Sequence, residues 1–75
     1  MKDKIIEILQ GLRPEFEFTE NVDFIEEGML DSFDIVSLVD AIEDNFNVVI
    51  LGEDIIPENF NSINSIKSLI EKNSK

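Results

Sequence analysis

Apolar side chains recur at helical spacing along three segments of the chain. The clearest segment is 32–46, whose apolar residues follow the i, i+3, i+4, i+7 spacing that places them on one face of a helix. These residues are Ile35, Leu38, Val39, Ile42 and Phe46. At 1.5 Å per residue, the segment predicts a helix about 22 Å long.

Two further helices are indicated near the ends of the chain. Residues 3–12 also carry their apolar side chains on one helical face. The Arg13–Pro14 pair ends this pattern, because a residue that precedes proline avoids the helical region. Ser62 fits an N-cap for a last helix, whose apolar residues between 63 and 70 share one face.

The two connections differ in what they predict. Residues 14–31 form a long loop whose scattered apolar residues indicate packing over the core. Residues 47–60 predict a loop with at most a short helical turn at 57–60, and the tail KNSK is expected to fray. The expected fold is all-α: a small antiparallel bundle of three main helices plus one short helix, with a long loop between the first two helices. It occupies a single domain over residues 1–75.

Composition excludes several kinds of function. The 75 residues include no Cys and no His, which removes disulfides, thiolate metal sites and the commonest general base. We therefore do not expect an enzyme. The apolar runs are too short to span a bilayer, and the N-terminus mixes charges into its apolar residues, unlike a signal peptide. A cytoplasmic protein without membrane insertion is expected, as a monomer.

The net charge of −11 is distributed unevenly. All six basic residues lie near the two ends, whereas residues 14–66 contain fourteen acids and no Lys or Arg. Such a segment is either a solvated acidic surface or a surface that meets basic partners. Nucleic acid is disfavoured as a partner, because phosphate contacts need Lys and Arg. No loop has the alternating acids, Gly and terminal Glu of a calcium site.

The outer face of the 32–46 helix combines apolar residues with acids. At about 100° per residue, the outward positions are Phe33, Ser37, Asp40 and Asp44, with Val36 and Glu43 at the margin. An apolar contact inside an acidic rim has the anatomy of a protein interface. For Asp34, Asp40, Glu43 and Asp44, a solvated helix face and a partner contact weigh equally on the sequence alone.

Ser32 stands where the loop pattern changes into the helix pattern. It can be a plain N-cap of the helix. It can also be a first-turn serine behind an Asp31 cap that pairs with Asp34 in a box-like arrangement. On the serine alone a structural role is the commoner one, whereas an exposed hydroxyl at a helix start can also be an attachment point. Gly28 before it indicates a tight turn.

The segment GMLDSFDIVSLVDAIEDNF resembles the modification-site region of the acyl carrier protein family, which includes fatty-acid, peptidyl and D-alanyl carriers. The resemblance is carried by Gly28, Leu30, Asp31, Ser32, the apolar Phe33, the buried stripe and Phe46. It extends to IPENFNSINSI, which resembles the third- and fourth-helix region of free-standing carriers. The first helix and the loop after it match in length and pattern only, and with them the resemblance covers nearly the whole chain. The PENF stretch is closer to D-alanyl and other aminoacyl carriers.

The resemblance implies a 4'-phosphopantetheine arm esterified to the Ser32 hydroxyl, with Asp31 helping to present this serine. The thiol of the arm would carry an acyl or aminoacyl group as a thioester, so a chain without Cys can still take part in thioester chemistry. The implied partners are a phosphopantetheinyl transferase, an acyl- or aminoacyl-activating ligase and downstream transferases with basic surfaces. They would meet the face formed by Phe33, Asp34, Val36, Asp40, Glu43 and Asp44.

Two positions depart from the family pattern. Ser37 stands where many carriers have an acid, and Asp40 stands where many have an apolar residue. The outer face is therefore less apolar than is usual in carriers of fatty-acid synthesis. The alternative function is an unmodified carrier-like module that binds a basic protein partner, and modification by a phosphopantetheinyl transferase separates the two hypotheses.

Overall fold

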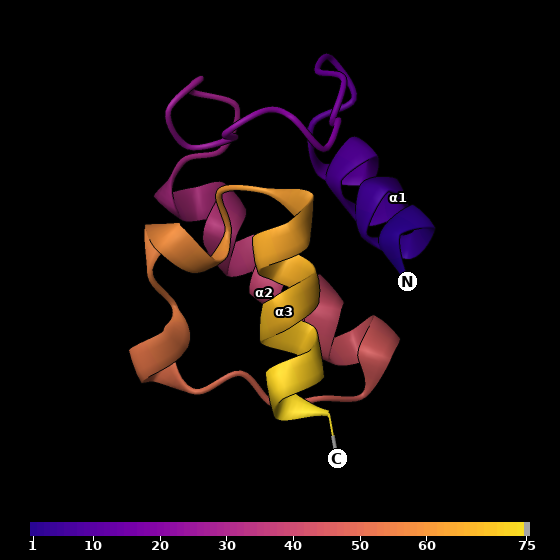
Figure 1. Cartoon of the computed structure of the whole chain (residues 1–75), viewed down its shortest axis with the longest axis vertical. Helices are drawn as coiled ribbons and strands as arrows, with labels where there is room; N and C mark the ends of the chain where they lie inside the picture. The colour runs from indigo at the N-terminus through magenta and orange to yellow at the C-terminus, as the bar shows by residue number, and fades with distance from the viewer. Residues whose placement is uncertain (75) are drawn as a thin grey trace.

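The computed structural model describes residues 1–74, and within them the chain forms three α-helices and two single-turn 3₁₀ helices, without a β-strand (Figure 1). In chain order the elements are α1 (Lys2–Leu12), α2 (Ser32–Phe46), η1 (Gly52–Asp54), η2 (Pro57–Asn59) and α3 (Ile63–Asn73). The all-α fold class is confirmed. The bounds of α2 are those predicted from its apolar spacing, and η2 is the short turn expected near Pro57, whereas η1 was not predicted.

The helix α1 packs against both α2 and α3. In Figure 1, α1 runs upward from the N-terminus, whereas α2 and α3 both run downward, so α1 is antiparallel to the other two. The long loop before α2 crosses the top of this view, and the two 3₁₀ helices lie along its left side. The start of α2 is therefore at the end of the bundle where the first connection arrives.

The core draws on all three α-helices and on both connections. The helical members are Ile5, Leu9, Leu38, Val39, Ile42, Ile63, Ile66, Leu69 and Ile70. The connections add Phe18, Phe24, Met29, Leu30, Val48, Ile50 and Phe60. In the predicted stripe of α2 the middle three residues are buried, whereas Ile35 and Phe46, near its two ends, are only partly buried against this core.

The first connection is held to the bundle by aromatic packing and by the backbone. Phe18 and Phe24 meet edge to face, with ring centroids 5.0 Å apart. The Phe24 N–H donates to the Asn61 carbonyl at 2.7 Å, which fastens the loop to the residue before the α3 cap. Gly28 then turns the chain with a positive φ of 73° and leads into the buried Leu30. The predicted packing of this loop over the core is confirmed, and it fixes the direction from which α2 begins.

The second half of the chain ends in a capped and anchored α3. The Ser62 hydroxyl accepts a hydrogen bond from the Ser65 N–H at 3.0 Å, as expected of an N-cap. The helix α3 continues to Asn73, so the first two residues of the tail that was expected to fray are helical, and the Lys72 ammonium binds the Asp54 carboxylate at 3.0 Å. Residue 75 of the KNSK tail lies outside the described residues. In the described part of the chain, each helix is too short or too polar to cross a membrane.

Candidate functional site

Ser32 is the first residue of α2, and Asp31 is its N-cap. The Asp31 carboxylate accepts a hydrogen bond from the Asp34 N–H at 3.0 Å, and the Asp34 carboxylate accepts one from the Asp31 N–H at 3.1 Å. These reciprocal bonds form a capping box. Of the two structural roles open to Ser32, the structure therefore shows the second, a first-turn serine behind an acidic cap.

This arrangement leaves the side chain of Ser32 exposed and free of a capping role. In the first turn of a helix the backbone N–H groups have no intrahelical acceptors, and the positive end of the helix dipole favours an anion. The box satisfies the N–H of Asp34, which leaves the N–H groups of Ser32 and Phe33 facing the helix start. These N–H groups and the positive end of the dipole favour a phosphodiester on the exposed Ser32 oxygen.

Arg13 places the positive charge of the site beside the capping box. Its guanidinium lies 2.8 Å from the Asp34 carboxylate, 3.4 Å from that of Asp31 and 3.2 Å from that of Glu15. The Arg13 Nε–H also donates to Asp34 at 3.0 Å. Sequence reasoning identified Arg13 only as the residue that ends the first helix, because nothing in its local sequence indicates acids that lie 18 and 21 residues later.

The guanidinium of Arg13 also changes the acidity of the box. Its hydrogen bond holds the pKa of the Asp34 carboxyl below the ordinary value of 3.8, and the Asp31 N–H acts in the same direction, against the opposing effect of burial. The hydrogen bond to Asp34, and after it the one to Glu15, raises the pKa of Arg13 further above its ordinary range. Asp34 is therefore a charged, hydrogen-bonded member of the cap at neutral pH.

The predicted partner face of α2 divides into free and engaged residues. The Phe33 residue is 84% exposed and Val36 is 65% exposed, and Asp40 and Asp44 beside them are exposed as well. Asp34 is half-buried, and its carboxylate is hydrogen-bonded to the Asp31 N–H within the capping box. Glu43 is also half-buried, and its carboxylate accepts a hydrogen bond from the Ile50 N–H at 2.9 Å.

Apolar exposure continues beyond α2, in the connection that leads to α3. Sequence reasoning did not select these residues, which are Val49, Leu51, Ile55 and Ile56. The alternation of the first two with the buried Val48 and Ile50 is a signal that could have indicated them. Their exposure adds apolar surface in the second connection of the bundle.

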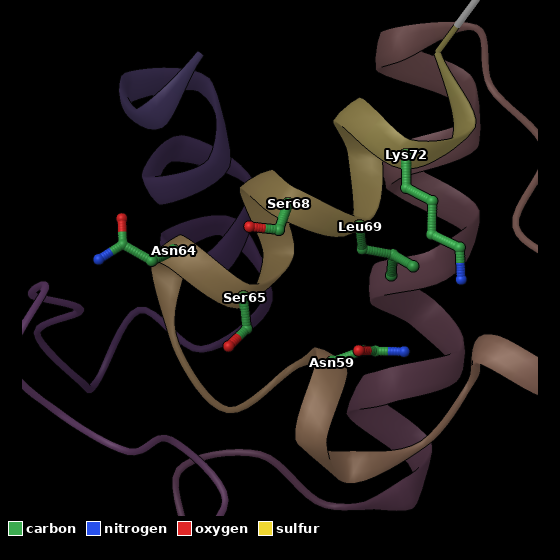
Figure 2. A pocket seen from close by; sticks show the side chains of 6 residues that line it. All are labelled: Asn59, Asn64, Ser65, Ser68, Leu69 and Lys72. Atoms are coloured by element: carbon green, nitrogen blue, oxygen red, sulfur yellow. The ribbon is translucent and has the colours of Figure 1, made fainter.

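A shallow hollow lies between η2 and α3 and is separate from the start of α2 (Figure 2). It is lined by Asn59, Asn64, Ser65, Ser68, Leu69 and Lys72. Five of the six lining residues are of polar type, and none comes from the first turn of α2. The Lys72 ammonium is bound to Asp54. Within residues 1–74, no cluster of acids has the arrangement of a metal site.

The fold is a small helical bundle that presents an exposed serine behind an acidic capping box. A family model described as "Phosphopantetheine attachment site" matches residues 3–71, and the chain belongs to this family. The resemblance drawn from the GMLDSF segment is thereby confirmed. Members of this family carry covalently attached 4'-phosphopantetheine, which is the cofactor of this chain.

The chain is also similar to curated carrier proteins over almost its full length. It is 28% identical over 74 residues to the D-alanyl carrier protein of Lactococcus lactis subsp. cremoris strain MG1363, covering 96% of this chain and 94% of that protein. The D-alanyl carrier protein of Lactococcus lactis subsp. lactis strain IL1403 matches with the same identity and coverage. Together with the family match, these relatives support a carrier function for this chain.

Proposed function

We propose that Ser32 carries the 4'-phosphopantetheine arm and that the chain holds an acyl or aminoacyl group on it as a thioester for partner enzymes. The observation that carries this proposal is the state of the Ser32 hydroxyl, which is exposed at the first residue of α2 while Asp31 supplies the cap. Asp31 thereby keeps the helix start intact when the hydroxyl is consumed in an ester.

The attachment reaction requires only a hydroxyl from this chain. The Ser32 Oγ forms a bond to the phosphorus that bears the pantetheine arm of coenzyme A, and the bond from that phosphorus to the bridging pyrophosphate oxygen breaks. The leaving group is adenosine 3',5'-bisphosphate, and the hydroxyl proton passes to a base on the transferase. The first-turn N–H groups of α2 favour the phosphodiester that remains on Ser32.

The arm supplies the thiol that this Cys-free chain lacks. An aminoacyl cargo, with D-alanine as the first candidate, is supported by the named D-alanyl carrier relatives and by the PENF stretch of the second connection. Its activating ligase and the downstream transferases perform the chemistry. The chain itself presents the cargo and has no catalytic step assigned to its residues.

The exposed face of α2 is the proposed docking surface for these enzymes. Phe33 and Val36 supply a small apolar centre, and Asp40 and Asp44 supply an acidic rim that suits a basic partner. Asp34 and Glu43 have less to offer a partner, since their carboxylates are already hydrogen-bonded within the chain.

The test is incubation of the unmodified protein with coenzyme A and a broad-specificity phosphopantetheinyl transferase, followed by intact-mass measurement. We expect the addition of one phosphopantetheinyl group, its loss in Ser32→Ala, and its retention in Ser68→Ala, which removes another exposed serine. Modification that persists in Ser32→Ala would overturn the site. A wild-type chain that is never modified would favour the unmodified interaction module.

A further inference from the structure

The backbone of Arg13 is held by two hydrogen bonds that do not involve its side chain. Its N–H donates to the Leu9 carbonyl at 2.9 Å, and its own carbonyl accepts from the Phe16 N–H at 3.2 Å. The residue therefore closes α1 and opens the first connection with a defined backbone. From this backbone the Arg13 side chain reaches the start of α2, where it contacts Asp34, which lies 21 residues later in the sequence.

At the start of α2 the guanidinium meets both carboxylates of the capping box. Asp34 receives the Arg13 Nε–H at 3.0 Å and has Nη2 at 2.8 Å, while Asp31 lies 3.4 Å from Nη2. A planar guanidinium can bind two acids at once through donors in a fixed fork, which an ammonium cannot reproduce. Arg13 thus joins the α1 end to the two residues that frame Ser32.

These contacts bear directly on the charge beside the Ser32 hydroxyl. Asp31 precedes the serine and Asp34 lies within the same helical turn, so both carboxylates stand near the oxygen that must meet the pyrophosphate of coenzyme A. Two uncompensated negative charges at this position repel an anionic donor. Arg13 is the basic residue that lies in ion-pair distance of both acids among the residues described.

We propose that Arg13 is a positioning residue for phosphopantetheine transfer, which holds the capping box in its observed geometry and offsets its charge so that Ser32 can meet an anionic donor. This inference rests on the proposed attachment at Ser32. It assigns to the end of α1 a role in a reaction that takes place at the start of α2.

The experiment compares Arg13→Gln, Arg13→Lys and Lys2→Gln. The control Lys2→Gln removes the same charge at the opposite end of α1 and breaks an ion pair with Glu20 at 2.6 Å, away from the capping box. Transferase kinetics with coenzyme A at low salt give kcat and KM for each variant. Arg13→Gln should raise KM for coenzyme A and lower kcat/KM about threefold to tenfold, the size expected for one charge a few ångströms from an anion when both are well exposed to water.

The Lys variant separates charge from geometry. Arg13→Lys should keep the KM for coenzyme A close to the wild-type value, because the positive charge remains. It should not keep the wild-type protection of the Asp34 amide from hydrogen exchange, because the guanidinium fork that holds the box is lost. The loss in Arg13→Gln should shrink at high salt, where the charges are screened. NMR titration should show the pKa of Asp34 rising in Arg13→Gln and unchanged in Lys2→Gln.

Three results would count against this role. Equal transferase kinetics for Arg13→Gln and Lys2→Gln at low salt would overturn it while leaving Ser32 as the attachment site. An Asp34 amide equally protected in Arg13→Gln and wild type would overturn the positioning effect by a readout independent of the enzyme. A wild-type chain that the transferase never modifies would overturn both this inference and the proposed function.

Discussion

Replacing Asp31 and replacing Ser32 should have opposite effects on stability and on modification, although the two residues are adjacent. In Asp31→Ala the Asp34 N–H loses its acceptor at 3.0 Å and the capping box is broken. In Ser32→Ala the box stays intact, because the serine is the first helical residue and not the cap. The asparagine variant Asp31→Asn keeps a side-chain oxygen for the Asp34 N–H and is the matched control.

The size of the effect follows from the cap. Removing an N-cap side chain costs about 1 kcal/mol of unfolding free energy, and asparagine caps about as well as aspartate. For a protein of this size, 1 kcal/mol corresponds to a fall in Tm of roughly 4–8 °C. The Ser32→Ala change should stay within about 0.5 kcal/mol of wild type, since it replaces an exposed residue with a strong helix former.

Thermal and urea unfolding followed by circular dichroism give the stabilities, and intact mass after transferase treatment gives the modification. We expect Asp31→Ala to be destabilised yet still modified to some extent, and Ser32→Ala to be stable and unmodified. If Ser32→Ala lost as much stability as Asp31→Ala, the serine would be acting as the cap. If Asp31→Asn unfolded like Asp31→Ala, the ion pair with Arg13 would outweigh the capping hydrogen bond.

The remaining predictions concern charge and docking. Added salt or magnesium should raise Tm because it screens repulsion among the acids; a flat Tm between low and physiological salt would mean that the fold compensates them. Because the folded pKa of Asp34 is lowered, its charge stabilises the fold above about pH 4 and this contribution is lost as pH falls through the folded pKa. The difference in unfolding free energy between wild type and Asp34→Asn should therefore be constant above about pH 4 and should disappear below it. A difference that persists at the lowest pH would contradict the stabilising role of the Asp34 charge. Phe33→Ala should mainly speed dissociation from the transferase, and Asp40→Lys should mainly slow association; wild-type rates for both would exclude this face.

The parts of the fold that could be predicted are those specified by neighbouring residues. The α2 bounds follow from an apolar stripe repeated over four turns, and the Ser62 cap follows from its position before the α3 stripe. The capping box could also be predicted as a candidate, since Asp31 and Asp34 have the spacing of reciprocal capping. What the sequence left open was which residue caps, and the structure decides it in favour of Asp31.

The parts that could not be predicted depend on residues far apart in the chain. η1 has no apolar periodicity, and its Asp54 is a buried acid that binds Lys72 across to α3. A local pattern would place such a carboxylate on the surface. Some acids of segment 14–66, which contains no Lys or Arg, are also paired with counter-charges, because basic residues from the ends of the chain lie beside them in the fold. These acids are Glu15, Glu20, Asp31, Asp34 and Asp54.

These ion pairs matter more for where charge lies than for stability, because partly exposed pairs contribute little to the free energy of unfolding. Around Ser32, one guanidinium faces the carboxylates of Glu15, Asp31 and Asp34, so the cluster keeps an excess of negative charge. Because of this excess, we expect the cations that hold the anionic coenzyme A to come from the transferase. Under the proposed function, the outer acids would favour a basic enzyme, while Arg13 would reduce repulsion at the Ser32 oxygen.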